Sequence, residues 1–471
     1  MQDVTIVTRD LGRFAEVVGG DRTTELLEIG RAAAEQLDGR CVVNVNSTAA
    51  GGGVAEMLHV LLGYVRGIGI NTRWLVVDGD PEFFALTKRI HNHLYGGVGD
   101  GGPLGDAEHT LYESTLRRNH DDLAENLQPG DIVILHDPQT AGLAEHAKRL
   151  GCAVVWRCHV GIDEQNADSE AGWDFLRPYL EPHVDHYVFT DAGFPPDWVA
   201  SADVTVIWPS IDPFSPKNQP LDDTTVEAIL TRAGIIAGRS GDTTFRRNDG
   251  SITRVERECD ICRTGPPANP NTPMLVQVSR WDTMKDMVGV MHAFAEHVDG
   301  TGLAELVLAG PSVAGVTDDP EGAEVLRECW DAWRKLPHAV RRHVQLVCLP
   351  MHDLDENAAI VNALQRHAAV VAQKSIAEGF GLTVAEAMLK GTPVVASAVG
   401  GIVDQVIHGE TGLLVHDPTD LAEAGAAMRL LLEDAELRAT LGEGAVKRAN
   451  EAHLGDTHLE RWVDVVAAVV D

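Results

Sequence analysis

The stretch Glu378-Gly379-Phe380-Gly381-Leu382-Thr383-Val384-Ala385-Glu386 places two carboxylates on either side of a glycine loop that opens onto a predicted helix. Anions bind where a glycine-rich loop meets a helix N-terminus, because free backbone N–H groups and the helix dipole point at them. Flanking carboxylates can accept hydrogen bonds from hydroxyl groups. The stretch therefore suits a sugar joined to a nucleoside diphosphate. The structural alternative is a capping box, in which Glu386 bonds the backbone N–H of Thr383.

A second motif precedes the first along the chain. The apolar run Met274–Val278 predicts a buried strand, and it leads into a loop that carries Arg280 and Lys285 ahead of another helix. Two cations at the carboxyl end of a strand suit a pyrophosphate leaving group. Cations on a loop are also commonly just solvated, but the presence of both motifs in this order favours the functional interpretation.

The two motifs resemble the Arg…Lys pair and the Glu-x7-Glu signature of the family-four retaining glycosyltransferases. Three N-terminal stretches, Val43–Glu56, His136–Gln139 and Trp156–Asp163, narrow the resemblance to the nucleotide-sugar-dependent trehalose synthases. Members of that family transfer glucose from a nucleoside diphosphate glucose to free glucose. The resemblance covers nearly the whole chain, and it implies the GT-B fold, in which two Rossmann-like α/β domains face a cleft.

Bulk properties agree with a large soluble enzyme. A chain of 471 residues, 44% of them hydrophobic, has material for two cores. No apolar run is long enough to span a membrane, and Met1–Thr5 does not begin a secretory signal. Seven scattered cysteines suit a reducing compartment, so we expect a cytoplasmic protein. The net charge of −33 disfavours nucleic acid and anionic membranes as partners, and requires a locally basic donor site.

Short apolar runs alternate with amphipathic helical stretches, a pattern typical of parallel sheets covered by helices. The expected strands are Cys41–Asn46, Arg73–Asp78, Asp131–His136, Ala153–His159, His186–Thr190, Val204–Trp208, Met274–Ser279, Glu305–Ala309, Val344–Cys348, Ala369–Gln373 and Pro393–Ala396. They indicate an N-terminal acceptor domain at 1–211, a C-terminal donor domain at 212–455, and a helix within 456–471 that crosses back to the first domain. Residues 238–271 form an insertion, either a hairpin or a mobile segment.

The resemblance implies roles for the C-terminal motifs. Arg280 and Lys285 bind the diphosphate and stabilise its growing charge. The backbone N–H groups that assist them come from Phe380, Gly381, Leu382 and Thr383. Glu386 holds the ribose hydroxyls, and Glu378 holds hydroxyls of the transferred sugar. Leu349–Met351 follows a strand and is expected to flank the base.

The N-terminal domain is expected to supply the acceptor site. Gly51, Gly52 and Gly53 lie between a strand and a helix, where they serve either a tight turn or the close approach of a sugar or phosphate. In the second interpretation, Gly52 and Gly53 bind the donor and Gly51 binds the acceptor. Asp137 and Gln139 are candidates for binding the acceptor, and a helix cap near Thr140 is the alternative for Asp137. His159 ends a strand, and the resemblance places it beside a glucose hydroxyl, with a structural histidine as the alternative.

No protein nucleophile is expected. In front-face transfer the acceptor oxygen enters on the side from which the diphosphate leaves, and the departing phosphate oxygen takes the acceptor proton. No protein-bound metal and no tightly bound cofactor are predicted, although Mg²⁺ is a possible counter-ion of the diphosphate. Asp78-Gly79-Asp80 is interpreted as a turn, and the C-x2-C pair Cys259 and Cys262 as free thiols rather than a zinc site.

The expected reaction is the reversible formation of α,α-trehalose from a nucleoside diphosphate glucose and glucose, by a homodimer. A retaining trehalose phosphorylase is the alternative enzyme, with inorganic phosphate in place of the nucleotide. Another family-four transferase with a different acceptor is a third possibility. A non-catalytic sugar or nucleotide sensor is the alternative outside enzymes, since fold does not establish function.

Overall fold

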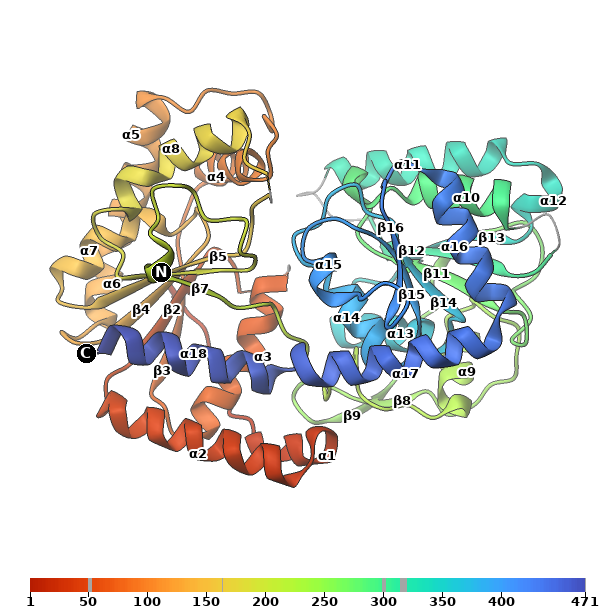
Figure 1. The fold of residues 1–471 in the computed structure, drawn as a ribbon, viewed down its shortest axis with the longest axis horizontal. Coiled ribbons are helices and arrows are strands. Elements are labelled where there is room, and N and C mark those ends of the chain that lie inside the picture. Colours follow the sequence, from red (N-terminus) through yellow and green to blue (C-terminus); the bar gives the residue numbers. More distant parts are fainter. Residues whose placement is uncertain (50–52, 163, 299–301, 314–319, 471) are drawn as a thin grey trace. The chain divides into compact units, whose positions relative to one another are not determined.

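The computed structural model describes residues 1–49, 53–162, 164–298, 302–313 and 320–470, and it divides into two compact α/β units. The first unit holds Met1–Ser210 and the residues from Gly455 on, whereas the second holds Ile211–Leu454. The first division lies one residue from the predicted boundary, in the proline-rich loop. The last helix, α18 (Gly455–Val470), belongs to the first unit (Figure 1).

The N-terminal unit is built on one seven-stranded sheet of order β1-β3-β2-β4-β5-β6-β7. All neighbours in this sheet pair in parallel except β1 and β3. The strands are β1 (Gln2–Asp3), β2 (Val42–Asn46), β3 (Thr72–Val76), β4 (Ile132–His136), β5 (Ala153–Cys158), β6 (His186–Phe189) and β7 (Val204–Val206). The helices, besides α18, are α1 (Ala15–Val18), α2 (Gly20–Leu37), α3 (Gly53–Gly67), α4 (Pro81–Leu94), α5 (Asp106–Arg117), α6 (His120–Asn126), α7 (Ala144–Arg149) and α8 (Ala167–Leu180).

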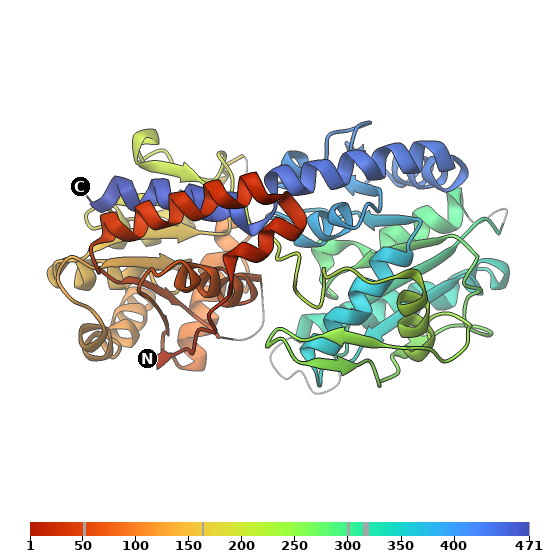
Figure 2. The same cartoon turned by 90° about the horizontal axis from the view of Figure 1, so that it is seen from below.

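Both faces of this sheet are covered, which is why its strands read as continuous apolar runs. Helices α4, α5, α7 and α8 contribute to the core on one face, which includes Trp156 and Trp173. Helices α2 and α18 pack on the other face around Val155 and Val188. In Figure 2 the α2 helix and the C-terminal α18 run side by side.

The C-terminal unit is built on a second seven-stranded sheet, of order β10-β13-β12-β11-β14-β15-β16. Its strands are β10 (Asp260–Cys262), β11 (Met274–Val278), β12 (Glu305–Pro311), β13 (Val344–Leu349), β14 (Val370–Gln373), β15 (Val394–Ser397) and β16 (Gly412–Val415). The helices are α9 (Asp223–Arg232), α10 (Met287–His297), α11 (Pro320–Lys335), α12 (His338–Arg341), α13 (Leu354–His367), α14 (Leu382–Leu389), α15 (Ile402–Gln405), α16 (Leu421–Glu433) and α17 (Ala435–Ala452). Only β10 runs antiparallel to its neighbour among the described pairings of this sheet.

The predicted strands are confirmed, with ends that differ by one or two residues. The sequence pattern did not predict β1, β10 and β16, each of which lies at an edge of its sheet. Within the described ranges, no helix combines the length and the apolar character that crossing a membrane requires.

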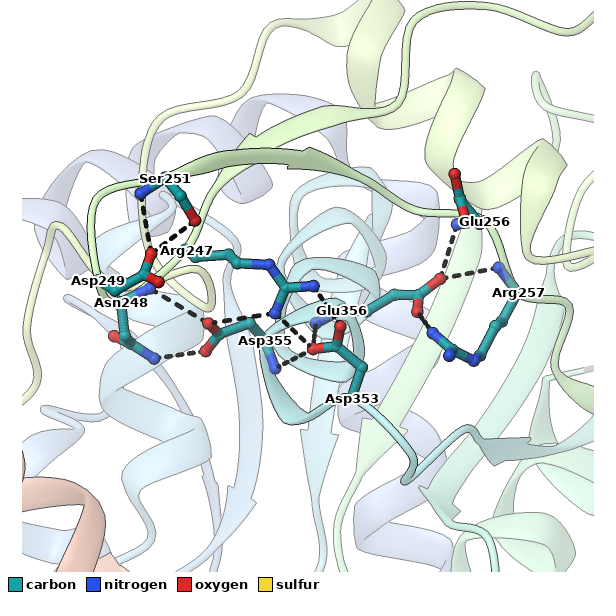
Figure 3. Close-up of polar contacts among 9 residues, drawn as sticks. All are labelled: Arg247, Asn248, Asp249, Ser251, Glu256, Arg257, Asp353, Asp355 and Glu356. Atoms are coloured by element: carbon teal, nitrogen blue, oxygen red, sulfur yellow. Dashed lines mark hydrogen bonds and ion pairs between the residues drawn. The ribbon is translucent and has the colours of Figure 1, made fainter.

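The insertion at 238–271 contains the hairpin of β8 (Thr244–Arg246) and β9 (Ile252–Arg254), followed by β10. The hairpin alternative is therefore confirmed. Figure 3 shows how the insertion is joined to the first turn of α13. Arg247 Nη1 donates to Asp353 Oδ1 over 2.9 Å, and Asn248 Nδ2 donates to Asp355 Oδ1 over 2.6 Å.

A second set of contacts lies further along the insertion (Figure 3). Glu356 is only 1% exposed, and its Oε1 accepts hydrogen bonds from the backbone N–H groups of Glu256 (2.6 Å) and Arg257 (2.7 Å). The guanidinium of Arg257 pairs with the other carboxylate oxygen. The insertion is thus fixed to α13. This helix follows the loop after β13 that includes residues 350 and 351, which are expected to flank the base.

Candidate functional site

The Glu-x7-Glu stretch forms a loop that ends in a left-handed glycine. Gly381 has φ 85° and is the N-cap of α14, with no side chain capping the helix. The first-turn N–H groups of Leu382 and Thr383 have no acceptor within the helix, and such groups are able to bind an anion. A Cβ on Gly400 would come within 1.7 Å of the carbonyl oxygen of Glu378, so only glycine fits that close approach.

The capping-box alternative is wrong. The helix begins before Thr383, whose hydroxyl donates to Gln373 Oε1 over 2.9 Å instead of capping the helix. Glu386 lies within the helix, with a side chain directed at the cations described below. The physical reason is that the left-handed Gly381 starts α14 two residues earlier than a capping box would.

Lys285 and Glu378 come together although they are distant in sequence. Lys285 Nζ lies 2.5 Å from Glu378 Oε2, and both side chains are largely buried. Ser375 Oγ donates to the same carboxylate oxygen over 3.1 Å, and Gln373 Nε2 lies 3.5 Å from it. This arrangement holds a cation and a carboxylate directly beside the glycine loop.

The loops that carry Lys285 and Glu378 are joined by further hydrogen bonds. Ile376 N–H donates to Met284 O over 2.7 Å, and Gln277 Nε2 donates to Lys285 O over 2.7 Å. Lys374, which is 1% exposed, forms an ion pair with Asp286. Because Asp286 directly follows Lys285, these contacts join the loop of Lys285 to the loop that follows β14.

Arg280 lies apart from this pair. Its side chain is 64% exposed and its Nη2 lies 3.0 Å from Asp282 Oδ2, a partner on the same loop. In the described part of the chain, no hydrogen bond or ion pair joins Arg280 to Lys285 or Glu378. An exposed guanidinium at the carboxyl end of β11 remains able to contact an anionic ligand.

Glu386 occupies a second, separate environment. Its side chain is 3% exposed and one carboxylate oxygen lies 3.5 Å from Lys217 Nζ. Lys390 Nζ donates to the Glu386 carbonyl oxygen over 3.0 Å and to Asn218 Oδ1 over 2.8 Å, and burial lowers the pKa of Lys390. Phe380 is 5% exposed and packs edge-to-face on His453, so it offers its main chain rather than its ring.

In the N-terminal unit, Asp137 follows β4 with φ 61°. Its Oδ1 accepts a hydrogen bond from the backbone N–H of His159 over 2.8 Å. Burial raises the pKa of Asp137 to about 7. The helix-cap alternative is wrong for this carboxylate, because the 3-10 helix Ala141–Leu143 has Thr140 as its N-cap and no side-chain capping bond.

His159 is partly buried, and its Nε2 lies 3.2 Å from His136 Nδ1. Burial, together with the charge of Arg157, lowers the pKa of His159 well below its usual range. The Gln139 side chain has a buried Oε1 with no hydrogen-bond partner among the described residues. Gly53 is the exposed first residue of α3, whereas Gly51 and Gly52 lie outside the described residues.

Several side chains of the site were not predicted from the sequence. They are Gln277, Asp286, Gln373, Lys374 and Ser375 around Lys285 and Glu378, Lys217 and Lys390 around Glu386, and Asn44 and His136 beside His159. A signal did exist for Gln373-Lys374-Ser375, because these polar residues end or directly follow a buried parallel strand.

The described residues contain no group of three or more His, Cys, Asp or Glu side chains that could hold a metal ion. Asp80 caps α4 by accepting from Phe83 N–H over 3.0 Å. Cys259 and Cys262 are free thiols at β10, and burial raises the pKa of Cys259 to about 12. A thiol with so high a pKa is a poor nucleophile at neutral pH.

Comparison with solved structures defines the class of protein. An α,α-trehalose-phosphate synthase (UDP-forming) from Burkholderia vietnamiensis superimposes with a TM-score of 0.64 at 15% identity, covering 91% of this chain and 100% of that one. A sucrose-phosphate synthase from Thermosynechococcus elongatus gives a TM-score of 0.61 at 17% identity, covering 91% and 96%. The fold is that of the GT-B glycosyltransferases.

Sequence comparison then defines the family. Residues 44–196 match the family "Trehalose synthase, N-terminal domain", and residues 263–448 match "Glycosyl transferases group 1". The trehalose synthase of Pyrococcus horikoshii is 32% identical over 97% of this chain and 96% of its own length. That of Rubrobacter xylanophilus is 35% identical over 94% and 92%. The chain belongs to the trehalose synthase family of family-four glycosyltransferases, and it is a hexosyltransferase.

Proposed function

We propose that the protein transfers glucose from a nucleoside diphosphate glucose to free glucose, forming α,α-trehalose with retention at the transferred carbon, and that the reaction is reversible. The observation that carries the proposal is the Lys285–Glu378 pair beside the uncapped start of α14. This grouping offers a cation and main-chain N–H groups for a diphosphate, and a carboxylate for sugar hydroxyls. The matched relatives named trehalose synthase support the choice of product.

In the proposed mechanism, the C-terminal unit holds the donor. Arg280 and Lys285 stabilise the charge that grows on the diphosphate as the bond to glucose breaks, which is commonly the largest catalytic contribution. The N–H groups of Phe380, Gly381, Leu382 and Thr383 assist. Glu386 accepts hydrogen bonds from the ribose, and its contact with Lys217 orients the carboxylate.

The N-terminal unit contributes groups for the sugars. We assign His159 to a hydroxyl of the transferred glucose, and Asp137 and Gln139 to the acceptor. Gly51, Gly52 and Gly53 allow close approach of the backbone. The acceptor oxygen attacks from the side on which the diphosphate leaves, and the leaving phosphate oxygen takes its proton. Exclusion of water favours transfer over hydrolysis.

Mg²⁺ enters this proposal only with the substrate, as a counter-ion of the diphosphate, and no step depends on a protein-bound metal. A homodimer is proposed from the family resemblance alone. Light scattering of the purified protein across a range of concentrations tests it, and a monomeric mass at every concentration would refute it.

Product analysis tests the function. Purified enzyme and glucose are incubated with the glucose donors of uridine, adenosine and guanosine diphosphate, and separately with α-glucose-1-phosphate. Trehalose from a nucleoside diphosphate donor supports the proposal and ranks the bases. Trehalose only from glucose-1-phosphate makes the enzyme a phosphorylase, an activity carried by name by a relative in Grifola frondosa that is 26% identical over 85% of this chain and 53% of its own length. No disaccharide from any donor, with tight ligand binding, points to a sensor.

A further inference from the structure

Three polar side chains form a chain of hydrogen bonds that runs from the middle of β2 to the carboxyl ends of β4 and β5. His136 is the last residue of β4, and its Nε2 lies 3.0 Å from Asn44 Oδ1 on β2. On its other side, His136 Nδ1 lies 3.2 Å from Nε2 of His159, which directly follows β5. The two rings are nearly parallel, at 8°, with centroids 5.5 Å apart. We refer to Asn44, His136 and His159 as the relay.

The charge state of the relay follows from its surroundings. Burial lowers the pKa of His136 to about 3, and that of His159 well below its usual range. The nearby Arg157 guanidinium, which is 0% exposed, adds to both effects. Both histidines are therefore neutral at physiological pH.

The hydrogen bonds then fix where each proton resides. A neutral imidazole has one donor and one acceptor nitrogen, and the carbonyl oxygen of Asn44 can only accept. His136 consequently carries its proton on Nε2, and its Nδ1 accepts. His159 must donate from Nε2, which leaves Nδ1 of His159 unprotonated.

The third histidine near the relay, His458, does not disturb these hydrogen bonds. Asn44, His136 and His458 are polar residues in the lining of a cavity whose other side chains are mainly apolar and come largely from α2, α3 and α18. Both ring nitrogens of His458 have hydrogen-bond partners outside the relay. Its Nδ1 lies 2.8 Å from Trp208 O, and its Nε2 accepts from Trp462 Nε1 over 2.9 Å. Burial lowers its pKa to about 3, so it is neutral.

The charged side chains near His159 form no hydrogen bond with its imidazole ring among the described contacts. The Asp137 carboxylate is bonded to the backbone N–H of His159 rather than to the imidazole. Arg157 Nη2 donates to Ile207 O over 2.6 Å, while its Nε and Nη1 have no hydrogen-bond partner among the described residues. The guanidinium therefore acts on the histidines through its charge.

We propose that Asn44 and His136 are positioning residues that hold His159 in the tautomer with an unprotonated Nδ1, so that its ring accepts a hydrogen bond from a glucose hydroxyl. The tautomer itself is independent of the reaction, whereas its use in binding sugar rests on the proposed function. A ring nitrogen that can only accept, as Nδ1 of His159 is proposed to do, distinguishes a hydroxyl from a group that cannot donate.

The tautomer is tested on the ligand-free protein by nitrogen NMR of enzyme labelled with ¹⁵N-histidine. The His159 signals are identified by their loss in His159→Gln. The expected pattern is a protonated Nε2 and an unprotonated Nδ1, which becomes a mixture of tautomers in His136→Gln and in Asn44→Leu. His186→Gln, which removes a buried histidine at the start of β6, is the matched control and should leave the pattern unchanged. A protonated Nδ1 in the wild type, or an unaltered pattern in both relay variants, overturns the proposal.

Its role in binding is tested with the series of monodeoxyfluoro glucoses and their nucleoside diphosphate donors. Fluorine cannot donate a hydrogen bond, so one position in the series should lower kcat/KM by about 10-fold more than the others, the effect of one oriented hydrogen bond. This discrimination should shrink in His136→Gln and Asn44→Leu and persist in His186→Gln. Equal discrimination in the relay variants and the wild type contradicts the role in binding. Failure of the proposed function would appear instead as no transfer by the wild type, with the NMR result unaffected.

Discussion

The carboxyl edge of the N-terminal sheet carries neutral hydrogen-bonding groups, whereas the same edge of the C-terminal sheet carries ion pairs. His136 and His159 represent the first kind, with Asn44 in the middle of β2 as the partner of His136 and with both histidine pKa values far below the usual range. Lys285–Glu378 and Lys374–Asp286 represent the second. Two sheets of similar topology therefore present different chemistry to their ligands.

The difference matches what each unit is proposed to bind. A diphosphate carries charge that grows during bond cleavage, so fixed cations stabilise it more than neutral dipoles do. A sugar carries no charge, and its hydroxyls are distinguished by which atoms donate and which accept. The comparison predicts that charge removal in the C-terminal unit costs more activity than any single change at the neutral edge.

The largest expected effect is on turnover. Lys285→Ala and Arg280→Ala should each lower kcat by roughly 10²-fold or more, the scale of losing one charge-stabilising group. Lys447→Ala, at a 75% exposed side chain, is the matched loss of charge and should not alter turnover. Steady-state kinetics with the best nucleoside diphosphate glucose measures this. Near-normal kcat in both site variants would remove these residues from the donor site.

A smaller effect is expected at Glu386. Glu386→Gln keeps the shape of the side chain but loses the charge that accepts hydrogen bonds from ribose. We expect the KM for the nucleotide donor to rise roughly 10-fold, with little change in the KM for glucose. Initial rates with each substrate varied in turn measure both constants. An unchanged donor KM with lower thermal stability would mean that Glu386 serves only the packing of Lys217 and Lys390.

The ion pairs of the insertion should affect stability rather than chemistry. Glu356→Gln weakens a buried carboxylate that accepts two backbone N–H groups, so we expect a loss of about 1–2 kcal/mol. Arg254→Ala, at a 70% exposed side chain 4.0 Å from Asp242, is the control and should change stability by less than about 0.5 kcal/mol. Urea unfolding, with hydrogen exchange of the insertion, measures both. Equal losses of stability in the two variants would show that the buried Glu356 carboxylate contributes no more than an exposed ion pair.

The smallest expected effect concerns Asp137 at the neutral edge. Its folded pKa of about 7 exceeds the ordinary value of 3.8, so its contribution to stability is fully present below 3.8 and lost as pH rises through 7. The Asn side chain of Asp137→Asn cannot ionise, so the stability of this variant relative to the wild type should grow by roughly 1 kcal/mol between pH 6 and 8.

Thermal unfolding at a series of pH values measures this difference. The control is Asp80→Asn, since the hydrogen bond from Arg118 lowers the pKa of Asp80 and that group is ionised throughout the range. Its difference from the wild type should stay constant from pH 5 to 8. A constant difference for Asp137→Asn as well would mean that the Asp137 carboxyl titrates normally.

The sequence was sufficient for most of the fold because buried parallel strands are apolar along most of their length. The runs at Ile132–His136 and Met274–Val278 are of this kind, and their strands end where a polar residue follows. Edge strands such as β1 and β10 lack that signal, since their residues are exposed or half-buried. The hairpin in the insertion was one of two open alternatives until its pairing was seen.

For the site, the sequence by itself determined the residues that share one short segment, such as the glycine loop from Glu378 to Glu386. Their spacing is local, so it survives any arrangement of the rest of the chain. Only the tertiary structure decided their partners: Lys374 for Asp286, Lys217 for Glu386, and Asn44 with His136 for His159. These pairs join residues from different strands and loops, and a hydrogen bond or charge contact of that kind depends on where the folded chain brings two atoms together. The same burial that creates the contacts also sets the neutral state of the histidines, which no sequence pattern specifies.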